Sequence, residues 1–249
     1  MSGTDTSFSV GRHGQGMTAG AVLFDLDDTL YPYPPCNEAG KAGGFEAARK
    51  LGYDLDREAF DDLYRAGRRE AKRDTDTTAA SHRRVLYFRH GLRERTGRPQ
   101  PEDALVLADA YWSSYLDEMA PAPDLTATLD ELAAAGVAIG VVTNLTTRIQ
   151  LRKLRRLGIG DRIDALVTSE EAGREKPGSA PITLALSRLG HPPSAAVMVG
   201  DNPATDVAGA NPLGLETVLI GESPPADAPD THRPDHAVDS LSAVPEVAL

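Results

Sequence analysis

Three carboxylates stand within four positions of the chain, directly after a short apolar run. The stretch reads FDLDDTLYPYPP, in which Asp25, Asp27 and Asp28 follow the apolar residues 21–24. Clustered like charges repel one another, and burying any of them is costly unless a cation or a shared proton compensates. A hard cation such as Mg²⁺ takes oxygen ligands and commonly binds one or two carboxylates together with a phosphate. By itself the stretch indicates either an acidic surface turn or part of a metal-dependent phosphate site.

Other polar groups follow later apolar runs, and these favour the second interpretation. They are Thr143 and Asn144 in VVTN, Lys176 in EKP, and Asp201 and Asp206 in GDNPATD. A hydroxyl, an amide, a lysine and carboxylates are the groups that a phosphate and its metal ion require. Their order along the chain would let all of them meet at one edge of a sheet.

The elements that must position these groups are visible as alternating apolar patterns. Strands are predicted at residues 21–24, 137–142, 195–199 and 216–220, with weaker candidates at 165–168 and 236–239. Their continuous rather than alternating apolar character is typical of strands buried on both faces of a parallel sheet. Helices with apolar residues three and four apart are predicted between them, ending at Gly136, Gly158 and Gly190. In one of these patterns Leu151, Leu154 and Leu157 precede Gly158. Strand–helix alternation predicts an α/β fold with right-handed crossovers, whose ligands bind at the carboxyl ends of the strands.

One long segment interrupts the alternation. From residue 33 to 119 the pattern is helical, with apolar spacing at 51–55, 60–64, 85–92 and 105–115. We interpret it as a helical domain inserted after the first strand, and Tyr31 to Pro35 as the hinge-like lead into it. The expected organisation is a flexible leader at 1–19, a core at 20–32 and 120–249, and a helical cap at 33–119.

Composition narrows the possible functions. The net charge of −11 argues against non-specific nucleic-acid binding, which needs a cationic surface, and gives no support for an anionic membrane as partner. Cys36 is the only cysteine, so no intramolecular disulfide can form. No apolar stretch reaches the roughly 18 residues of a membrane span, and residues 1–20 lack the apolar core of a signal peptide. We therefore expect a cytoplasmic protein, while its oligomeric state is not determined by the sequence.

As a set and in this order, four stretches resemble the motifs of the haloacid dehalogenase-like (HAD) hydrolases. They are FDLDDTL, VVTN, SEEAGREKPG and VGDNPATD, and the resemblance covers roughly residues 20–220. It implies a Rossmann-like parallel sheet core with an inserted α-helical cap domain, in agreement with the pattern of elements.

The resemblance also implies a catalytic role for each matched residue. Asp25 would be the nucleophile that forms an aspartyl-phosphate, and Asp27 the general acid that becomes the base activating water. Thr143, with Asn144 beside it, would hydrogen-bond the phosphoryl oxygens of the substrate. Lys176 would neutralise charge on the nucleophile and on the phosphate.

A magnesium site is implied at the same place. The ligands would be the Asp25 and Asp201 carboxylates and the Asp27 backbone carbonyl, with Asp206 supporting this group rather than binding the metal directly. Asp28 is expected to be a solvated or turn-capping carboxylate without a catalytic role.

Asp27 chooses among the reactions of the family. The dehalogenases that resemble this fold lack an acid at that position, because a halide leaves without a proton whereas an alkoxide needs one. We expect a Mg²⁺-dependent phosphatase acting on a small phosphorylated metabolite, either a sugar phosphate or a nucleoside monophosphate. A sugar-phosphate mutase of the same superfamily is one alternative. A non-catalytic binding or regulatory protein on this fold is another.

The cap should decide which substrate enters. Eleven of the 26 Lys and Arg residues lie between residues 65 and 98, which reverses the sign of the charge locally. They could attract an anionic substrate, but a solvated helix face is the simpler interpretation. His82, Arg83 and Arg84 are the first cap residues to test, and Trp112, Tyr111 and Tyr115 are expected to pack in a core.

Overall fold

The computed structural model describes residues 18–249, so the leader expected at 1–19 falls outside the described residues except for its last two positions. Six strands form one fully parallel sheet in the order β3-β2-β1-β4-β5-β6. The strands are β1 (Ala21–Phe24), β2 (Ala138–Thr143), β3 (Ala165–Thr168), β4 (Ala196–Gly200), β5 (Glu216–Ile220) and β6 (His236–Val238). The predicted α/β fold with a parallel sheet is confirmed, and each strand lies within one residue of its predicted position.

Ten α-helices occur in the described part of the chain. They are α1 (Tyr33–Lys50), α2 (Arg57–Asp74), α3 (Arg84–Thr96), α4 (Pro101–Glu118), α5 (Leu125–Ala134), α6 (Thr147–Leu157), α7 (Ser169–Ala172), α8 (Ala180–Leu189), α9 (Ala208–Ala210) and α10 (Val244–Ala248). Two short elements also matter for the site: the 3₁₀ turn η1 (Ala79–His82) and the π-turn η4 (Pro203–Val207). None of the helices within residues 18–249 is long and apolar enough to cross a bilayer.

The sheet is buried on both faces, which explains its continuous apolar runs. Because successive side chains of a strand point to opposite faces, Ala21 and Leu23 of β1 join a cluster with α8, whereas Val22 and Phe24 join a cluster with α5 and α10. Burying an apolar side chain contributes about 1.5–3 kcal/mol, so a polar residue at any of these β1 positions would be costly. The sheet is thereby a rigid platform for the loops at its carboxyl edge.

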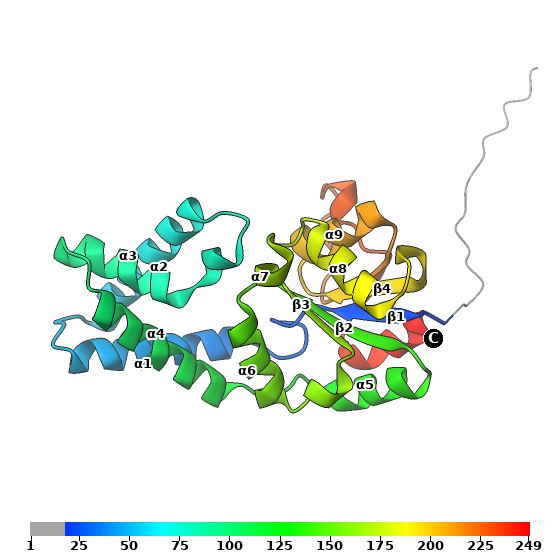
Figure 1. The fold of residues 1–249 in the computed structure, drawn as a ribbon, viewed down its shortest axis with the longest axis horizontal. Coiled ribbons are helices and arrows are strands. Elements are labelled where there is room, and N and C mark those ends of the chain that lie inside the picture. The colour runs from blue at the N-terminus through cyan, green and yellow to red at the C-terminus, as the bar shows by residue number, and fades with distance from the viewer. Residues whose placement is uncertain (1–17) are drawn as a thin grey trace, which may run out of the picture.

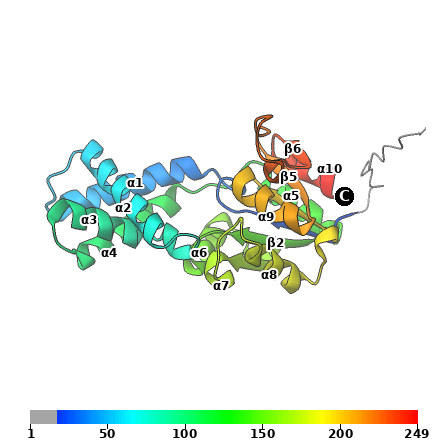
Figure 2. The same cartoon turned by 90° about the horizontal axis from the view of Figure 1, so that it is seen from above.

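The helical insertion is also present, between β1 and β2. Helices α1 and α4 pack side by side, as do α2 and α3, and this cap lies to one side of the sheet (Figure 1). Helix α5 belongs to the same stretch of chain but packs against β2 and α10. The view from above separates the cap from the C-terminal end of the chain, which lies at the opposite end of the molecule (Figure 2). A continuous apolar cluster joins the cap interior to one face of the sheet.

The structure differs from two expectations about the start of the cap. In the predicted lead at Tyr31 to Pro35, the last three residues are already helical, because α1 begins at Tyr33 and holds Pro34 and Pro35 in its first turn. Proline is tolerated there since the first amides of a helix have no partner within the helix. The apolar spacing at 51–55 does not form a helix. Helix α1 ends at Lys50, and Gly52 follows with a φ of 89°, which turns the chain toward α2.

Helices α2 and α3 approach so closely that Gly67 has no room for a side chain. A Cβ at this position would stand 1.8 Å from the Tyr87 carbonyl oxygen. Gly67→Ala is therefore expected to lower the free energy of unfolding by about 2–3 kcal/mol, because the helices must separate. Chemical denaturation monitored by circular dichroism measures this change. Gly160→Ala is the matched control, since a Cβ there meets no atom within 4 Å; an equal loss in both variants would contradict the close helix contact.

Candidate active site

The polar groups that follow β1, β2 and β4 meet at the carboxyl edge of the sheet, beside a cavity of about 380 Å³ that the cap helps to enclose. Core residues that line this cavity include Asp25, Asp27, Asp28, Thr143, Asn144, Lys176 and Asp201. Cap residues that line it are Tyr33, Arg68, Lys72, His82, Arg84 and Tyr87. The structure thus brings the residues predicted to act in catalysis, substrate binding and metal binding to one cavity between core and cap. Asp206, predicted to support them, does not line the cavity.

Lys176 is the charged centre of this edge. Its Nζ lies 2.6 Å from Asp25 Oδ1 and 2.6 Å from Asp206 Oδ1, and it donates a hydrogen bond of 2.6 Å to the Val142 carbonyl. Asp206 reaches this position because Gly200 has no side chain, since a Cβ there would stand 2.3 Å from Asp206 Oδ2. One buried ammonium therefore links the carboxylate that follows β1 to the carboxylate in η4.

The carboxylates outnumber the cations at this point. Burial raises the pKa of Asp25 to about 8, and the charges of Asp206, Asp27 and Asp201 add to the effect, against the opposing influence of Lys176. Burial and Asp206 likewise raise the pKa of Asp201 to about 6. Burial would lower the pKa of Lys176, but Asp206 and Asp25 outweigh it and raise this pKa. Such raised carboxyl pKa values mark a deficit of positive charge.

A divalent cation fits the donors that are present. Asp25, Asp201 and Asp206 each offer a carboxylate oxygen, and these oxygens lie within 4.8 Å of one another. Thr29 Oγ1 donates to Asp201 Oδ1 at 3.1 Å and so orients that carboxylate. An all-oxygen group of this kind suits a hard cation. The described residues therefore hold a candidate acidic metal site at the predicted place.

Thr143 and Asn144 differ in what they are free to do. Gln150 Nε2 donates to Thr143 Oγ1 at 2.6 Å, which leaves the threonine hydroxyl proton available as a donor toward the cavity. Asn144 uses both atoms of its amide on the Lys176 backbone: Oδ1 accepts from the Lys176 amide at 2.9 Å, and Nδ2 donates to its carbonyl at 3.2 Å. Asn144 thus fixes the loop that carries Lys176, and its predicted contact with substrate stays a prediction.

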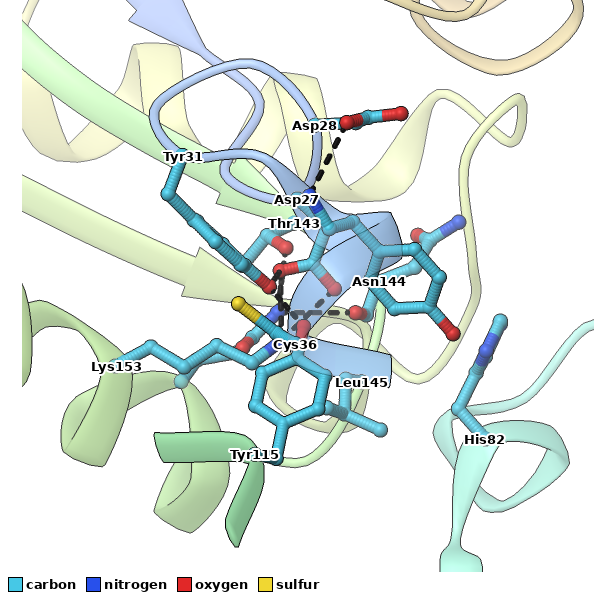
Figure 3. Close-up of polar contacts among 12 residues, drawn as sticks. Asp27, Asp28, Tyr31, Cys36, His82, Tyr115, Thr143, Asn144, Leu145 and Lys153 are labelled. Atoms are coloured by element: carbon cyan, nitrogen blue, oxygen red, sulfur yellow. Dashed lines mark hydrogen bonds and ion pairs between the residues drawn. The ribbon is translucent and has the colours of Figure 1, made fainter. Parts of the chain in front are cut away.

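Asp27 is held by a second lysine, on α6. Lys153 Nζ donates to both Asp27 carboxylate oxygens, at 2.6 and 2.8 Å, and the Tyr31 hydroxyl donates to Oδ1 at 2.8 Å. Tyr31 in turn shares a hydrogen bond with the Tyr115 hydroxyl. Figure 3 shows these side chains converging on the Asp27 carboxylate, while His82 approaches from the cap. Asp27 therefore stands in one fixed orientation at the wall of the cavity.

Lys153 and Gln150 are the functional residues that sequence reasoning missed. The buried face of α6 is formed by Gln150, Lys153, Leu154 and Leu157. Leu151 belongs to the leucine spacing seen in the sequence, but it lies off this face and is 53% exposed. The positions 150, 153, 154 and 157 follow the i, i+3, i+4, i+7 spacing of a helix face. Two polar residues occupy that face because their partners, Thr143 and Asp27, lie beneath it.

The remaining interpretations of the opening stretch and of the aromatic residues agree with the structure. Asp28 has a left-handed φ of 68°, and its Oδ1 accepts a hydrogen bond from the Tyr33 amide at 3.1 Å. It is therefore a turn-capping carboxylate at the start of α1. Tyr111, Trp112 and Tyr115 are buried and pack edge to face in the cap.

The cap contacts the core through residues 77–83. Ser81 Oγ donates to Glu175 Oε1 at 2.9 Å, and His82 Nε2 lies 3.1 Å from the same oxygen. Arg83 donates to Glu170 Oε1 at 3.1 Å. Because Glu175 immediately precedes Lys176, this contact ties the position of the cap to the loop that carries the buried lysine.

The basic segment divides into two groups. Arg65, Arg73, Arg83 and Arg93 form ion pairs with carboxylates and are exposed, as a solvated face requires. Arg84 departs from that interpretation because it is buried and lines the cavity, together with Arg68 and Lys72.

The chain is similar to a known family and to several known proteins. A family model described as haloacid dehalogenase-like hydrolase matches residues 19–214. The ribulose-1,5-bisphosphate 5-phosphatase of Halopiger xanaduensis is 55% identical over 236 residues, covering 92% of this chain and 99% of that protein. The glyceraldehyde 3-phosphate phosphatase of Methanopyrus kandleri is 36% identical over 200 residues, covering 80% of this chain and 83% of that protein.

A solved structure shares the fold at lower identity. It is the HAD-hydrolase YfnB of Bacillus subtilis, bound to magnesium. The two chains are 18% identical, with a TM-score of 0.69 and coverage of 93% of this chain and 99% of that one. At this identity the likeness concerns the fold, including the cap inserted between β1 and β2.

Proposed function

Since the chain belongs to the haloacid dehalogenase-like hydrolase family, we propose that it hydrolyses a sugar phosphate through a phosphoryl group carried transiently on Asp25. The relatives that are 55% and 36% identical to this chain are both phosphatases, which supports the same activity here. The observation that carries the proposal is the paired arrangement at the cavity. Lys176 contacts Asp25, and Lys153 contacts Asp27, so a different buried ammonium stands beside each of these two carboxylates, and each can serve a separate role.

The first step forms the aspartyl-phosphate. Lys176 holds Asp25 Oδ1, which leaves Oδ2 to attack phosphorus while the ester bond between phosphorus and the sugar oxygen breaks. Asp27 enters this step in its protonated form and gives that proton to the departing sugar oxygen, so that an alcohol rather than an alkoxide leaves. The carboxylate that remains is stabilised by the Lys153 ammonium beside it. The Thr143 hydroxyl would donate to a phosphoryl oxygen, and Lys176 would act through its charge, because its three N–H groups are taken by Asp25, Asp206 and the Val142 carbonyl. Stabilising charge on the phosphoryl oxygens is most of what phosphoryl transfer asks of a protein.

The second step returns the nucleophile. Asp27, now a carboxylate, takes a proton from a water molecule, and the water oxygen attacks phosphorus. The bond between phosphorus and Asp25 breaks, releasing inorganic phosphate and the free Asp25 carboxylate. The contact of residues 77–83 with Glu175 keeps the cap over the cavity and limits the access of bulk water.

We assign a magnesium ion to the acidic group. Asp25 and Asp201 would hold it through their carboxylates and Asp27 through its backbone carbonyl, with Asp206 supporting the group through Lys176. When bound, the ion would supply positive charge beside the phosphoryl oxygens and relieve the crowding of the carboxylates. The raised pKa values of Asp25 and Asp201 support this assignment, as does the magnesium-bound relative.

Removal of divalent cations is expected to suppress phosphate release by at least about 100-fold, with recovery on addition of Mg²⁺.

Independently of activity, saturating Mg²⁺ should raise the free energy of unfolding by about 1–3 kcal/mol, because the ion binds the folded chain alone. Thermal unfolding with and without Mg²⁺ measures this increase. It should disappear in Asp201→Asn and persist in Asp239→Asn, a change at an exposed carboxylate; an unchanged increase in Asp201→Asn would exclude Asp201 as a ligand.

The substrate class follows from the relatives and the cavity. Among these relatives, the protein 55% identical acts on a sugar bisphosphate and the next on a triose phosphate. The cavity of about 380 Å³ lies within the roughly 300–1,000 Å³ range of small-molecule sites. We therefore favour a sugar phosphate over a nucleoside monophosphate, and a bisphosphate among sugar phosphates. The cytoplasmic location expected from the sequence stays part of the proposal.

A phosphate-release screen tests the proposed function. The purified chain with Mg²⁺ is given ribulose 1,5-bisphosphate, ribulose 5-phosphate, glyceraldehyde 3-phosphate and a nucleoside monophosphate, and inorganic phosphate is measured. The first compound should give the highest kcat/KM. Transfer of phosphate to a second sugar without release would instead identify a mutase. No release or transfer from any of them would favour the non-catalytic alternative.

A further inference from the structure

The lysines of the core already have carboxylate partners. Lys176 contacts Asp25 and Asp206, and Lys153 contacts Asp27. The cations that the cap brings to the same cavity are different. Arg68, Lys72 and Arg84 line it, and none of them has a carboxylate within ion-pair distance among residues 18–249, unlike the neighbouring Arg65, Arg73, Arg83 and Arg93.

Arg84 is the most telling of the three because its charge is buried. Its guanidinium donates to the His82 carbonyl at 2.7 Å and to the hydroxyls of Tyr33 and Tyr111 at 3.1 and 3.2 Å. Its Nε has no hydrogen-bond partner in the described part of the chain, and the residue is only 5% exposed. A buried cation whose hydrogen-bond partners are all neutral is costly, unless an anion enters beside it.

Arg68 and Lys72 add two solvent-exposed cations to the same cavity. They stand four residues apart on α2, so their side chains share one face of the helix. Both reach the cavity from an exposed position. Partial burial and the nearby charges of Arg68 and Arg84 lower the pKa of Lys72, against the opposing influence of Glu175 and Asp76, as expected where like charges gather.

A substrate with one phosphate would leave these cations without a partner. Its phosphate would lie at the core end of the cavity, against Lys176, Thr143 and the magnesium ligands. We propose that Arg84, Arg68 and Lys72 form a second anion subsite on the cap side of the cavity, which binds the phosphate of a sugar bisphosphate that is not cleaved. The inference rests on the proposed function and assigns its choice of substrate to the cap.

The test compares two substrates that differ by one phosphate. Values of kcat/KM are measured for ribulose 1,5-bisphosphate and ribulose 5-phosphate with the wild type, Arg68→Gln and Lys72→Gln. Each variant should lose about 10- to 100-fold with the bisphosphate, which corresponds to one charged hydrogen bond, and less than about 3-fold with the monophosphate. Arg73→Gln is the matched control, because it removes the same charge from α2 at a residue paired with Glu70 and Asp74.

Equal losses with both substrates would overturn the subsite, since the charges would then act on all anions alike. No loss with either substrate, or equal efficiency of the wild type on both, would overturn it as well. Calorimetric titration of the two sugars into Asp25→Asn, with and without Arg68→Gln, separates the subsite from hydrolysis. Selective loss of bisphosphate binding there would support the subsite even if the wild type released no phosphate, a result that would refute only the proposed function.

Arg84 is tested in the same way once its fold is checked. Arg84→Met keeps the apolar stem among Tyr87, Tyr111 and Trp112, whose rings lie 5.0–5.2 Å from the guanidinium carbon. If thermal unfolding shows a folded variant, it should lose at least as much bisphosphate selectivity as Arg68→Gln. If Arg84→Met is unfolded, the proposed subsite is tested by Arg68→Gln and Lys72→Gln alone.

Discussion

Asp25→Asn is expected to abolish phosphate release, with a loss of at least about 10⁴-fold in kcat. The amide is a far weaker nucleophile than the carboxylate, while its size and its contact with Lys176 Nζ through an amide oxygen are preserved. Steady-state phosphate release with Mg²⁺ and the best substrate of the screen measures the loss. Incubation with substrate should label the wild type, and not the variant, with acid-stable phosphate at this position.

The pH dependence of the stability of Asp25→Asn gives a second test that does not depend on turnover. In Mg²⁺-free buffer the raised pKa values of Asp25 and Asp201, about 8 and about 6, mean that the folded chain retains protons that the unfolded chain has released. Stability must therefore fall as the pH rises from about 4 toward 8. Asp25→Asn removes one of these groups, so its stability should fall less over that range. Residual turnover above about 1% of wild type in a pure sample would contradict the assignment of the nucleophile.

Much of the core could be predicted because its signals are local. A strand buried on both faces must be apolar at every position, so β1 and β5 stand at their predicted residues. Glycines at 158 and 190, with φ values of 70° and 74°, end α6 and α8 where the pattern indicates. The site residues then follow from topology, because parallel strands deliver Asp25, Thr143 and Asp201 to one edge.

The start of the cap could not be predicted from composition alone. Prolines 34 and 35 indicate a turn unless one knows that they occupy the first turn of a helix, where their missing amides are harmless. The sequence also does not predict which of the basic residues are exposed and which are buried. Arg68 and Arg69 are adjacent on α2, yet only Arg68 lines the cavity with Asp25, because helix rotation rather than residue type decides.

The pairing of Asp27 with Lys153 has no local signal, since 126 positions separate the two residues. The sequence of α6, TRIQLRKLRRL, is rich in arginine and lysine, and any of them could be solvated. Only the helix-face spacing shared by residues 150, 153, 154 and 157 distinguishes Lys153 from the others. Buried ion pairs of this kind are fixed by tertiary packing, which places Asp27 beneath the helix.

Lys153→Met is expected to lower kcat/KM for a sugar phosphate by about 100-fold, within the range of general acid–base catalysis. Lys153 is 1% exposed and lies among the rings of Tyr31, Trp112 and Tyr115, 5.4–5.7 Å from each. Methionine fits this apolar surround, so the change mainly removes the two hydrogen bonds that orient Asp27. The matched control is Arg152→Met, which removes a neighbouring exposed cation from α6.

Comparing two substrates with different leaving groups shows whether Lys153→Met disturbs the orientation of Asp27 or the structure as a whole. A sugar alkoxide requires the proton of Asp27, whereas p-nitrophenolate leaves without one. Because kcat/KM covers only the steps up to departure of the leaving group, Lys153→Met should lose less than about 10-fold with p-nitrophenyl phosphate. Tyr31→Phe, which deletes the third hydrogen bond to Asp27, should show the same preference with a smaller loss. An equal loss on both substrates would mean that Lys153 supports the fold rather than the acid, and that Asp27 does not need this orientation to deliver its proton.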